Sequence, residues 1–94
     1  MRKYEVQFSK RFKKSYKRAI KRGKDLSKLE KVVELLADGV PLPEQYRNHN
    51  LIGDYEGFKE CHIEPDWLLI YRYLNNILVL ELFDTGSHSD LFKM

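Results

Sequence analysis

Three apolar runs in the second half of the chain constrain its fold more than any other feature of the sequence. They cover residues 57–63, 67–73 and 77–83. The breaks between them are short and rich in turn formers, namely residues 64–66 and the pair Asn75 and Asn76. Because such short connections join neighbouring antiparallel strands, the pattern predicts a three-stranded meander.

The residues before position 24 predict a strand and then a helix. Residues 4–8 alternate between apolar and polar side chains, as on a half-buried strand. Ser9 can cap the helix that follows, and Gly23 is expected to end it. The apolar positions of this helix recur every four residues, which predicts one stripe facing the core: Phe12, Tyr16 and Ile20.

A second helix is predicted from about residue 26 to the residue before Gly39. Asp25 and Ser27 are both candidate N-caps, and Ser27 with Glu30 has the spacing of a capping box. Its expected buried face comprises Leu26, Leu29, Val32, Val33 and Leu36. Because the connection to the first helix is so short, the two helices are expected to form an antiparallel hairpin.

These elements predict an α+β fold with the order β-α-α-β-β-β. The helix hairpin would cover one face of an antiparallel sheet and leave the other face open. Residues 41–57 form a long polar connection between the two halves. A chain of 94 residues has the length of one domain, so we expect a single domain over residues 1–94.

Positive charge is concentrated at the start of the chain. Residues 1–31 hold thirteen Lys or Arg against three acidic residues, a net charge of +10, whereas residues 32–94 have a net charge of −7. The basic half suits a polyanion such as nucleic acid, although a solvated helix surface explains the same charge. The lysines of the first helix that are candidates for RNA binding are Lys10, Lys13, Lys14, Lys17 and Lys21.

The sequence also predicts the compartment. It contains no apolar run near the ~18 residues that a membrane-spanning helix needs, and its first residues do not lead into a signal-peptide core. A single cysteine, Cys61, cannot form an internal disulfide. We therefore expect a soluble, cytoplasmic protein with no membrane partner.

Three histidines, His49, His62 and His88, lie in the C-terminal part of the chain. Imidazole, with an ordinary pKa of ~6.5, can accept or donate a proton near neutral pH. RNA carries its own nucleophile, the 2′-hydroxyl, so its cleavage needs proton carriers and stabilisation of the phosphorus. Each histidine alone is explained as well by a structural role in a strand, a turn or a helix cap.

A zinc site is the alternative for these histidines, because three His and one Asp offer enough ligands. However, Cys61 and His62 are neighbours on a predicted strand and so point to opposite faces. No pair shows the spacing of a metal motif. The sequence therefore predicts neither a metal nor another cofactor.

Three blocks of the sequence carry a family resemblance: YRNHNLIG at residues 46–53, ECHIEPDWLLIY at residues 60–71, and TGSHSDLF at residues 85–92. In this order they closely resemble the YafQ family of bacterial toxins, within the wider RelE/ParE superfamily. The detailed match covers residues 41–92, and the basic helix hairpin agrees in layout only.

The resemblance implies a type II toxin that cleaves messenger RNA on the ribosome and is silenced by a cognate antitoxin. It also implies a RelE-like fold. The residues that it places in catalysis are His49, His62, Asp66 and His88, with His88 as the main proton-transfer residue. Trp67 and Phe92 would hold the nucleotide by stacking, although core packing also explains them.

Two further positions concern the substrate phosphate. Arg72 is a candidate phosphate contact, chosen because the site otherwise lacks a cation. Asp84 stands where many relatives carry an arginine, so we expect no cationic contact at that position.

The chemistry that follows is metal-independent cleavage through the 2′-hydroxyl, leaving a 2′,3′-cyclic phosphate and a 5′-hydroxyl. Two alternatives remain at this point, a ParE-like inhibitor of DNA gyrase and an RNA-binding protein without catalysis. The histidines argue against the first, because a protein inhibitor needs no proton carriers. Loss of toxicity in His88→Ala separates the nuclease from the second.

Overall fold

The computed structural model describes residues 2–92. Its longer elements are β1 (Glu5–Phe8), α1 (Lys10–Lys21), α2 (Leu26–Ala37), β2 (His49–Asn50), β3 (Lys59–Glu64), β4 (Trp67–Leu74), β5 (Val79–Gly86) and α3 (His88–Phe92). Short 3₁₀ turns cover Glu44–Tyr46, Gly53–Tyr55 and Asn75–Ile77.

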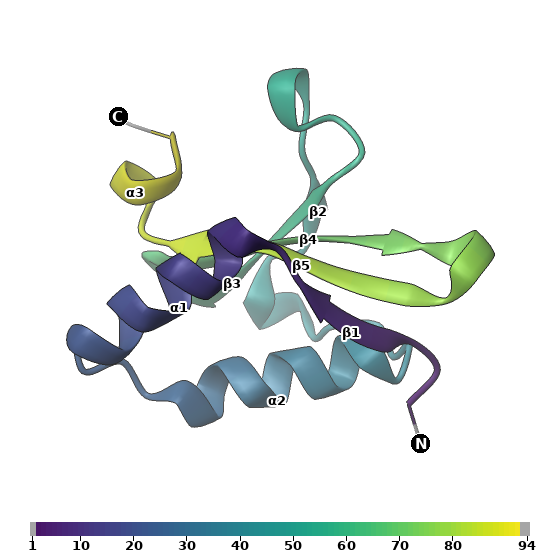
Figure 1. Ribbon diagram of the computed structural model, residues 1–94, viewed down its shortest axis with the longest axis horizontal. Helices are drawn as coiled ribbons and strands as arrows, with labels where there is room; N and C mark the ends of the chain where they lie inside the picture. Colours follow the sequence, from purple (N-terminus) through teal and green to yellow (C-terminus); the bar gives the residue numbers. More distant parts are fainter. Residues whose placement is uncertain (1, 93–94) are drawn as a thin grey trace.

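The sheet has five strands in the order β1-β5-β4-β3-β2. The predicted meander is confirmed, because β3, β4 and β5 pair antiparallel in sequence order. Both long helices lie on one side of the sheet, and α3 lies on the other (Figure 1). The predicted fold class is thus confirmed, with one exception: β1 pairs parallel with β5.

The start of the last strand and one additional strand are the main differences from the sequence prediction. The last strand begins at Val79 and not at Ile77, because residues 75–77 form a 3₁₀ turn and Leu78 takes a left-handed φ of 51°. The polar connection contains an additional short strand, β2, which pairs with β3 so that His49 lies opposite Glu60. This pairing brings a distant part of the sequence to the edge of the sheet.

The helix hairpin forms as the capping residues predict. The Ser9 side chain accepts a hydrogen bond from the Phe12 amide, and Asp25, not Ser27, is the N-cap of α2. The buried face of α2 consists of Leu29, Val32, Leu36 and Ala37, while Leu26 and Val33 are only partly buried. No helix within residues 2–92 is long and apolar enough to cross a membrane.

The predicted apolar stripe of α1 is wrong in part. Phe12 is buried, but Ile20 is 51% exposed. The face that packs on the sheet contains Ser15 and Ala19 instead. This rotation has a polar cause, because the Ser15 hydroxyl donates a 2.5 Å hydrogen bond to Asp84 of β5.

Asp84 is a structural carboxylate that joins β5 to α1. It is only 4% exposed, and it accepts hydrogen bonds from Ser15 Oγ, from Arg11 Nε at 3.0 Å and from the Thr85 amide at 2.8 Å. A buried carboxylate needs such donors, because an unpaired one costs several kcal/mol.

Candidate functional site

The three histidines converge from three different elements. His49 lies on β2, His62 on β3 and His88 at the start of α3. The ring centroids of His49 and His62 are 6.1 Å apart, and those of His62 and His88 are 5.7 Å apart. The cluster lies on the sheet face away from the helix hairpin, since Cys61, the strand neighbour of His62, is buried in the core beneath the helices. The structure thus brings all three imidazoles together.

Asp66, in the turn between β3 and β4, holds His88 by two hydrogen bonds. Its Oδ1 accepts from the His88 amide at 2.9 Å and lies 2.6 Å from ring Nδ1. The backbone hydrogen bond from His88, followed by the ring contact, lowers the pKa of Asp66 below its ordinary value. Because an ionised carboxylate only accepts, Nδ1 carries the proton and Nε2 is left for the substrate.

The helix that carries His88 is fixed by a capping box. Ser87 Oγ accepts from the Asp90 amide at 3.1 Å, and Asp90 Oδ2 accepts from the Ser87 amide at 2.9 Å. Arg22, the residue after α1, binds the same carboxylate at 2.6 Å and holds the pKa of Asp90 well below its usual range. These contacts attach α3 to the helix hairpin, so the position of His88 depends on both layers of the fold.

Glu60, a residue for which the sequence predicted no specific role, lies between the other two histidines. Its Oε1 is 3.4 Å from His49 Nε2 and 3.5 Å from His62 Nε2, and the residue is 4% exposed. Within residues 2–92, its Oε2 has no hydrogen-bond partner. Strand alternation contained the signal, because Glu60 and His62 are two residues apart and therefore share a face.

The hydrogen bonds at Nδ1 of His49 and His62 determine which form of each Nε2 faces the Glu60 carboxylate. His49 Nδ1 lies 2.8 Å from the carbonyl of Arg47, and His62 Nδ1 lies 3.4 Å from the carbonyl of Pro65. Carbonyls accept, so each Nδ1 donates and each Nε2 of a neutral ring would face Glu60 with a lone pair. A stable arrangement needs a proton or a cation among these three groups.

The same three groups fit a divalent transition metal. The ligand atoms of His49, Glu60 and His62 all lie within 4.8 Å of one another. Two imidazoles and one carboxylate are a common ligand set for such ions. A metal held there would supply Lewis-acid chemistry, and it would occupy the nitrogen lone pairs that otherwise take protons.

Trp67 does not present a face for stacking, which corrects the sequence expectation. It is 1% exposed, and its indole Nε1 donates to Thr85 Oγ1 at 3.1 Å. The ammonium of Lys24 lies over its ring, 5.5 Å from the centroid. Strand alternation explains the burial, because Trp67 shares the helix-covered face of β4 with Leu69 and Tyr71.

Arg72 is engaged elsewhere on the sheet. Its Nε binds Glu81 Oε1 at 2.7 Å, and its guanidinium lies 4.8 Å from the centroid of Phe58. The contact with Glu81 joins β4 to β5, Phe58 directly precedes β3, and neither contact involves a histidine. The structure therefore does not bring Arg72 into the histidine cluster.

Phe92 belongs to an aromatic cluster on the open face of the sheet. Its ring lies 5.8 Å from that of Tyr55, edge to face, and it remains partly exposed. Phe58 and Phe83 complete the cluster. The sequence alone did not predict these three aromatic neighbours, because two of them lie in or beside the long polar connection.

The five lysines proposed for RNA binding are all exposed on α1. The site as a whole is therefore a set of proton carriers on the open face of the sheet, with a basic helix on the other layer. A small α+β protein of this kind is equipped for proton transfer on a polyanionic substrate.

Comparison with known proteins identifies the family. Residues 4–93 match the family described as the bacterial toxin of type II toxin-antitoxin system, YafQ. The chain is 39% identical over 89 residues to the mRNA interferase toxin YafQ of Escherichia coli K12. The aligned residues cover 94% of this chain and 95% of that protein. The chain therefore belongs to the YafQ family of bacterial toxins.

Solved structures agree with this assignment. The crystal structure of the E. coli DinJ-YafQ toxin-antitoxin complex has a TM-score of 0.87 at 37% identity, covering 96% of this chain and 98% of that one. The crystal structure of a metal-bound toxin from Helicobacter pylori has a TM-score of 0.90 at 43% identity, and the match covers 95% of this chain and 99% of that one.

Proposed function

We propose that this toxin is an mRNA interferase, an endoribonuclease that cuts messenger RNA on the ribosome and needs no metal for the reaction. The observation that carries the proposal is the convergence of three imidazoles, with Asp66 fixing the ring of His88. The curated name of the E. coli K12 relative, an mRNA interferase toxin, supports the same activity.

The proposed reaction uses the 2′-hydroxyl of the RNA as nucleophile. One imidazole takes its proton while the 2′-oxygen bonds to phosphorus and the bond from phosphorus to the 5′-oxygen breaks. A second, protonated imidazole gives its proton to the leaving 5′-oxygen. The products are a 2′,3′-cyclic phosphate and a 5′-hydroxyl.

His88 is the proposed main proton-transfer residue, because Asp66 binds its Nδ1 and leaves Nε2 for the substrate. His49 and His62 complete the set of proton carriers, with buried Glu60 between them. Phe92 is the proposed stacking residue for a nucleobase, worth about 1 to 3 kcal/mol if a base packs on it.

The basic helix α1 is the proposed contact with ribosomal RNA. Its lysines are exposed and distributed along the helix, so they can neutralise several phosphates without selecting a sequence. Such a substrate places the activity in the cytoplasm, where messenger RNA is translated.

A cognate antitoxin is the proposed regulator, as the E. coli DinJ-YafQ complex supports by analogy. The exposed basic helix and the open sheet face suit an acidic or amphipathic segment that wraps around the toxin. Binding of such a segment across the histidine cluster would exclude the RNA.

The test is to map the products on messenger RNA bound to purified ribosomes. A chelator selective for zinc and copper leaves the Mg²⁺ that ribosomes need, and we expect cleavage to persist in its presence. The expected products carry a 2′,3′-cyclic phosphate and a 5′-hydroxyl, whereas 3′-hydroxyl ends would refute the mechanism. A parallel gyrase supercoiling assay is expected to show no inhibition.

A further inference from the structure

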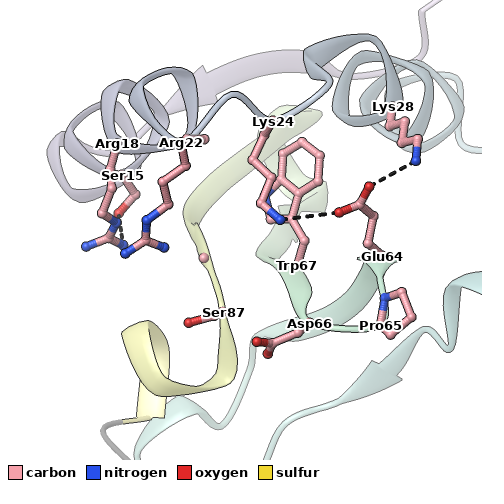
Figure 2. Close-up of a pocket in the computed structure, with 12 residues that line it drawn as sticks. Ser15, Arg18, Arg22, Lys24, Lys28, Glu64, Pro65, Asp66, Trp67 and Ser87 are labelled. Atoms are coloured by element: carbon pink, nitrogen blue, oxygen red, sulfur yellow. Dashed lines mark hydrogen bonds and ion pairs between the residues drawn. The ribbon is translucent and has the colours of Figure 1, made fainter.

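A second feature next to the histidines is a cavity of about 460 Å³ between the helix hairpin and the start of α3. Figure 2 shows that side chains from α1 and α2 enter it from one side, opposite the turn between β3 and β4. Four of the residues that line it are cationic: Arg18, Arg22, Lys24 and Lys28.

The cations of this cavity outnumber the carboxylates that bind them. Lys24 and Lys28 share one partner, Glu64, at 3.3 Å and 2.9 Å. Arg22 is paired with Asp90. Asp66 also lines the cavity, so with Arg18 included four cations stand against three carboxylates, a surplus of one positive charge.

Arg18 is the least engaged of the four. Its Nη2 lies 3.4 Å from Ser15 Oγ and 3.9 Å from Asp90 Oδ2, so both contacts are long, and the side chain is 41% exposed. Gly86 gives the guanidinium room, because a Cβ at Gly86 would lie 3.2 Å from Arg18 Nη2. A planar guanidinium held this way can form two parallel hydrogen bonds with a phosphate.

The cavity and the histidine cluster share one residue, Asp66. This residue lines the cavity, and the same carboxylate holds the His88 ring. An RNA strand that passes Asp66 from a scissile phosphate at His88 would lead its next phosphate toward the cationic cavity. A positive groove beside the reacting group is the usual way that proteins follow a single strand.

We propose that this cavity binds the RNA backbone phosphate next to the scissile one, with Arg18 as its principal ligand and Lys24 and Lys28 as supporting cations. The proposal rests on the nuclease function proposed above and names a part of its substrate site. In this proposal Arg18 takes the role of phosphate cation for which Arg72 was the candidate from the sequence.

Trp67 provides a direct signal for occupancy of the cavity. It is the only tryptophan in the sequence, it lines the cavity, and Lys24 lies over its ring. A phosphate that draws Lys24 away from the ring will change the fluorescence of Trp67. Binding can thus be measured without cleavage.

The experiment titrates the full-length toxin with a trinucleotide whose riboses are all 2′-deoxy, so that it cannot react by the proposed route. We expect a saturable fluorescence change. Arg18→Gln is expected to weaken binding at least about tenfold, because it removes a charge-assisted phosphate contact. Lys31→Gln, an exposed change of equal charge on α2 outside the cavity, is the control and is expected to bind like the wild type.

A second probe identifies the phosphate. It is the same trinucleotide with one neutral methylphosphonate in place of the phosphate beside the reacting position. We expect wild type to bind this probe weakly. Arg18→Gln should bind it as weakly as wild type does, because the charge that Arg18 would contact is already gone. Equal binding of both probes by wild type, or no saturable change up to millimolar concentration, would overturn the cavity assignment. Cleavage of ribosome-bound messenger RNA by wild type in that case would leave the nuclease standing. Normal binding of the 2′-deoxy trinucleotide without any cleavage of messenger RNA would leave the cavity assignment standing and refute the nuclease.

Discussion

Asp66 binds both the backbone amide and the ring Nδ1 of His88, at 2.9 and 2.6 Å, although the two residues are 22 positions apart in the chain. One carboxylate oxygen thus fixes the start of α3 and the orientation of the ring upon it. Because Nδ1 must donate to this oxygen, the tautomer of His88 is set, and its Nε2 faces away from Asp66. The turn between β3 and β4 therefore controls the chemistry of a residue on another element.

His88→Ala is expected to reduce the rate of messenger RNA cleavage by about 10²- to 10⁴-fold, the usual contribution of a positioned proton-transfer group. His88 is partly exposed, so the melting temperature should change little. Cleavage kinetics on ribosome-bound messenger RNA measure the effect. A variant that folds and cuts at the wild-type rate would remove His88 from the reaction.

Asp66→Asn is expected to lower the cleavage rate by about 10- to 100-fold, because the amide cannot stabilise a charged imidazole as a carboxylate does. The pKa of Asp66 is lowered by the hydrogen bonds from His88. A carboxyl group whose pKa is lower when folded contributes stability above its unfolded pKa and loses it as pH falls through the folded value.

The stabilisation of wild type relative to Asp66→Asn should therefore persist from pH 8 down to pH 5, because the carboxylate stays ionised over this range. It should shrink only when the pH falls below the ordinary pKa of 3.8. Thermal unfolding over a pH series checks this. A difference that already disappears between pH 7 and 5 would show that the carboxylate is not held by His88 as described.

Added Zn²⁺ is expected to inhibit cleavage, because the nitrogen lone pairs of His49 and His62 that would bind it are those needed for protons. Glu60→Gln should weaken the inhibition, since it removes the anionic ligand. Calorimetric titration with Zn²⁺ alone measures binding independently of activity. Stimulation of cleavage by Zn²⁺ would contradict the metal-independent mechanism.

Reversal of charge at Lys13, Lys17 and Lys21 together is expected to weaken ribosome association steeply. These lysines follow one another at four-residue spacing on the exposed side of α1. Each lost phosphate contact should reduce the salt dependence of binding by about one unit of slope. Lysine-to-glutamine changes at the same positions should weaken binding less. If the charge-reversed variant binds ribosomes with the same affinity as wild type at every salt concentration, α1 does not contact ribosomal RNA.

Asp84→Ala is expected to lower the free energy of unfolding by about 2 to 4 kcal/mol, because it leaves the buried Ser15 hydroxyl and Thr85 amide without their acceptor. Urea unfolding measures the loss. Arg11→Ala is the matched comparison, since Arg11 is half exposed and its removal should cost less. Equal stability of Asp84→Ala and wild type would refute the structural role.

The order of helices and strands was predictable because it depends on local signals. Turn residues separate the three C-terminal strands, and Ser9 and Asp25 cap the two long helices where the sequence suggested. The convergence of the histidines was expected only through the family resemblance. Nothing local in the sequence places His49 beside Glu60, since a two-residue strand has too little pattern to recognise.

The errors in the prediction arise where long-range contacts override local pattern. The resemblance implied that Trp67 stacks on the nucleotide, but its position on the face of β4 that packs under the helices buries it, as the alternative of core packing had it. Ile20 continues an apolar stripe, yet the Ser15 to Asp84 hydrogen bond turns α1 so that Ile20 faces solvent. The parallel pairing of β1 with β5 also depends on tertiary packing.

Replacement of the single 2′-hydroxyl at the scissile position of a ribosome-bound messenger RNA tests the central claim most directly. Wild-type toxin should cut the all-ribose message and leave the 2′-deoxy message intact at that bond, while binding both equally. Cleavage of the 2′-deoxy message at the same bond would show that water or another group is the nucleophile, and the proposed mechanism would be wrong.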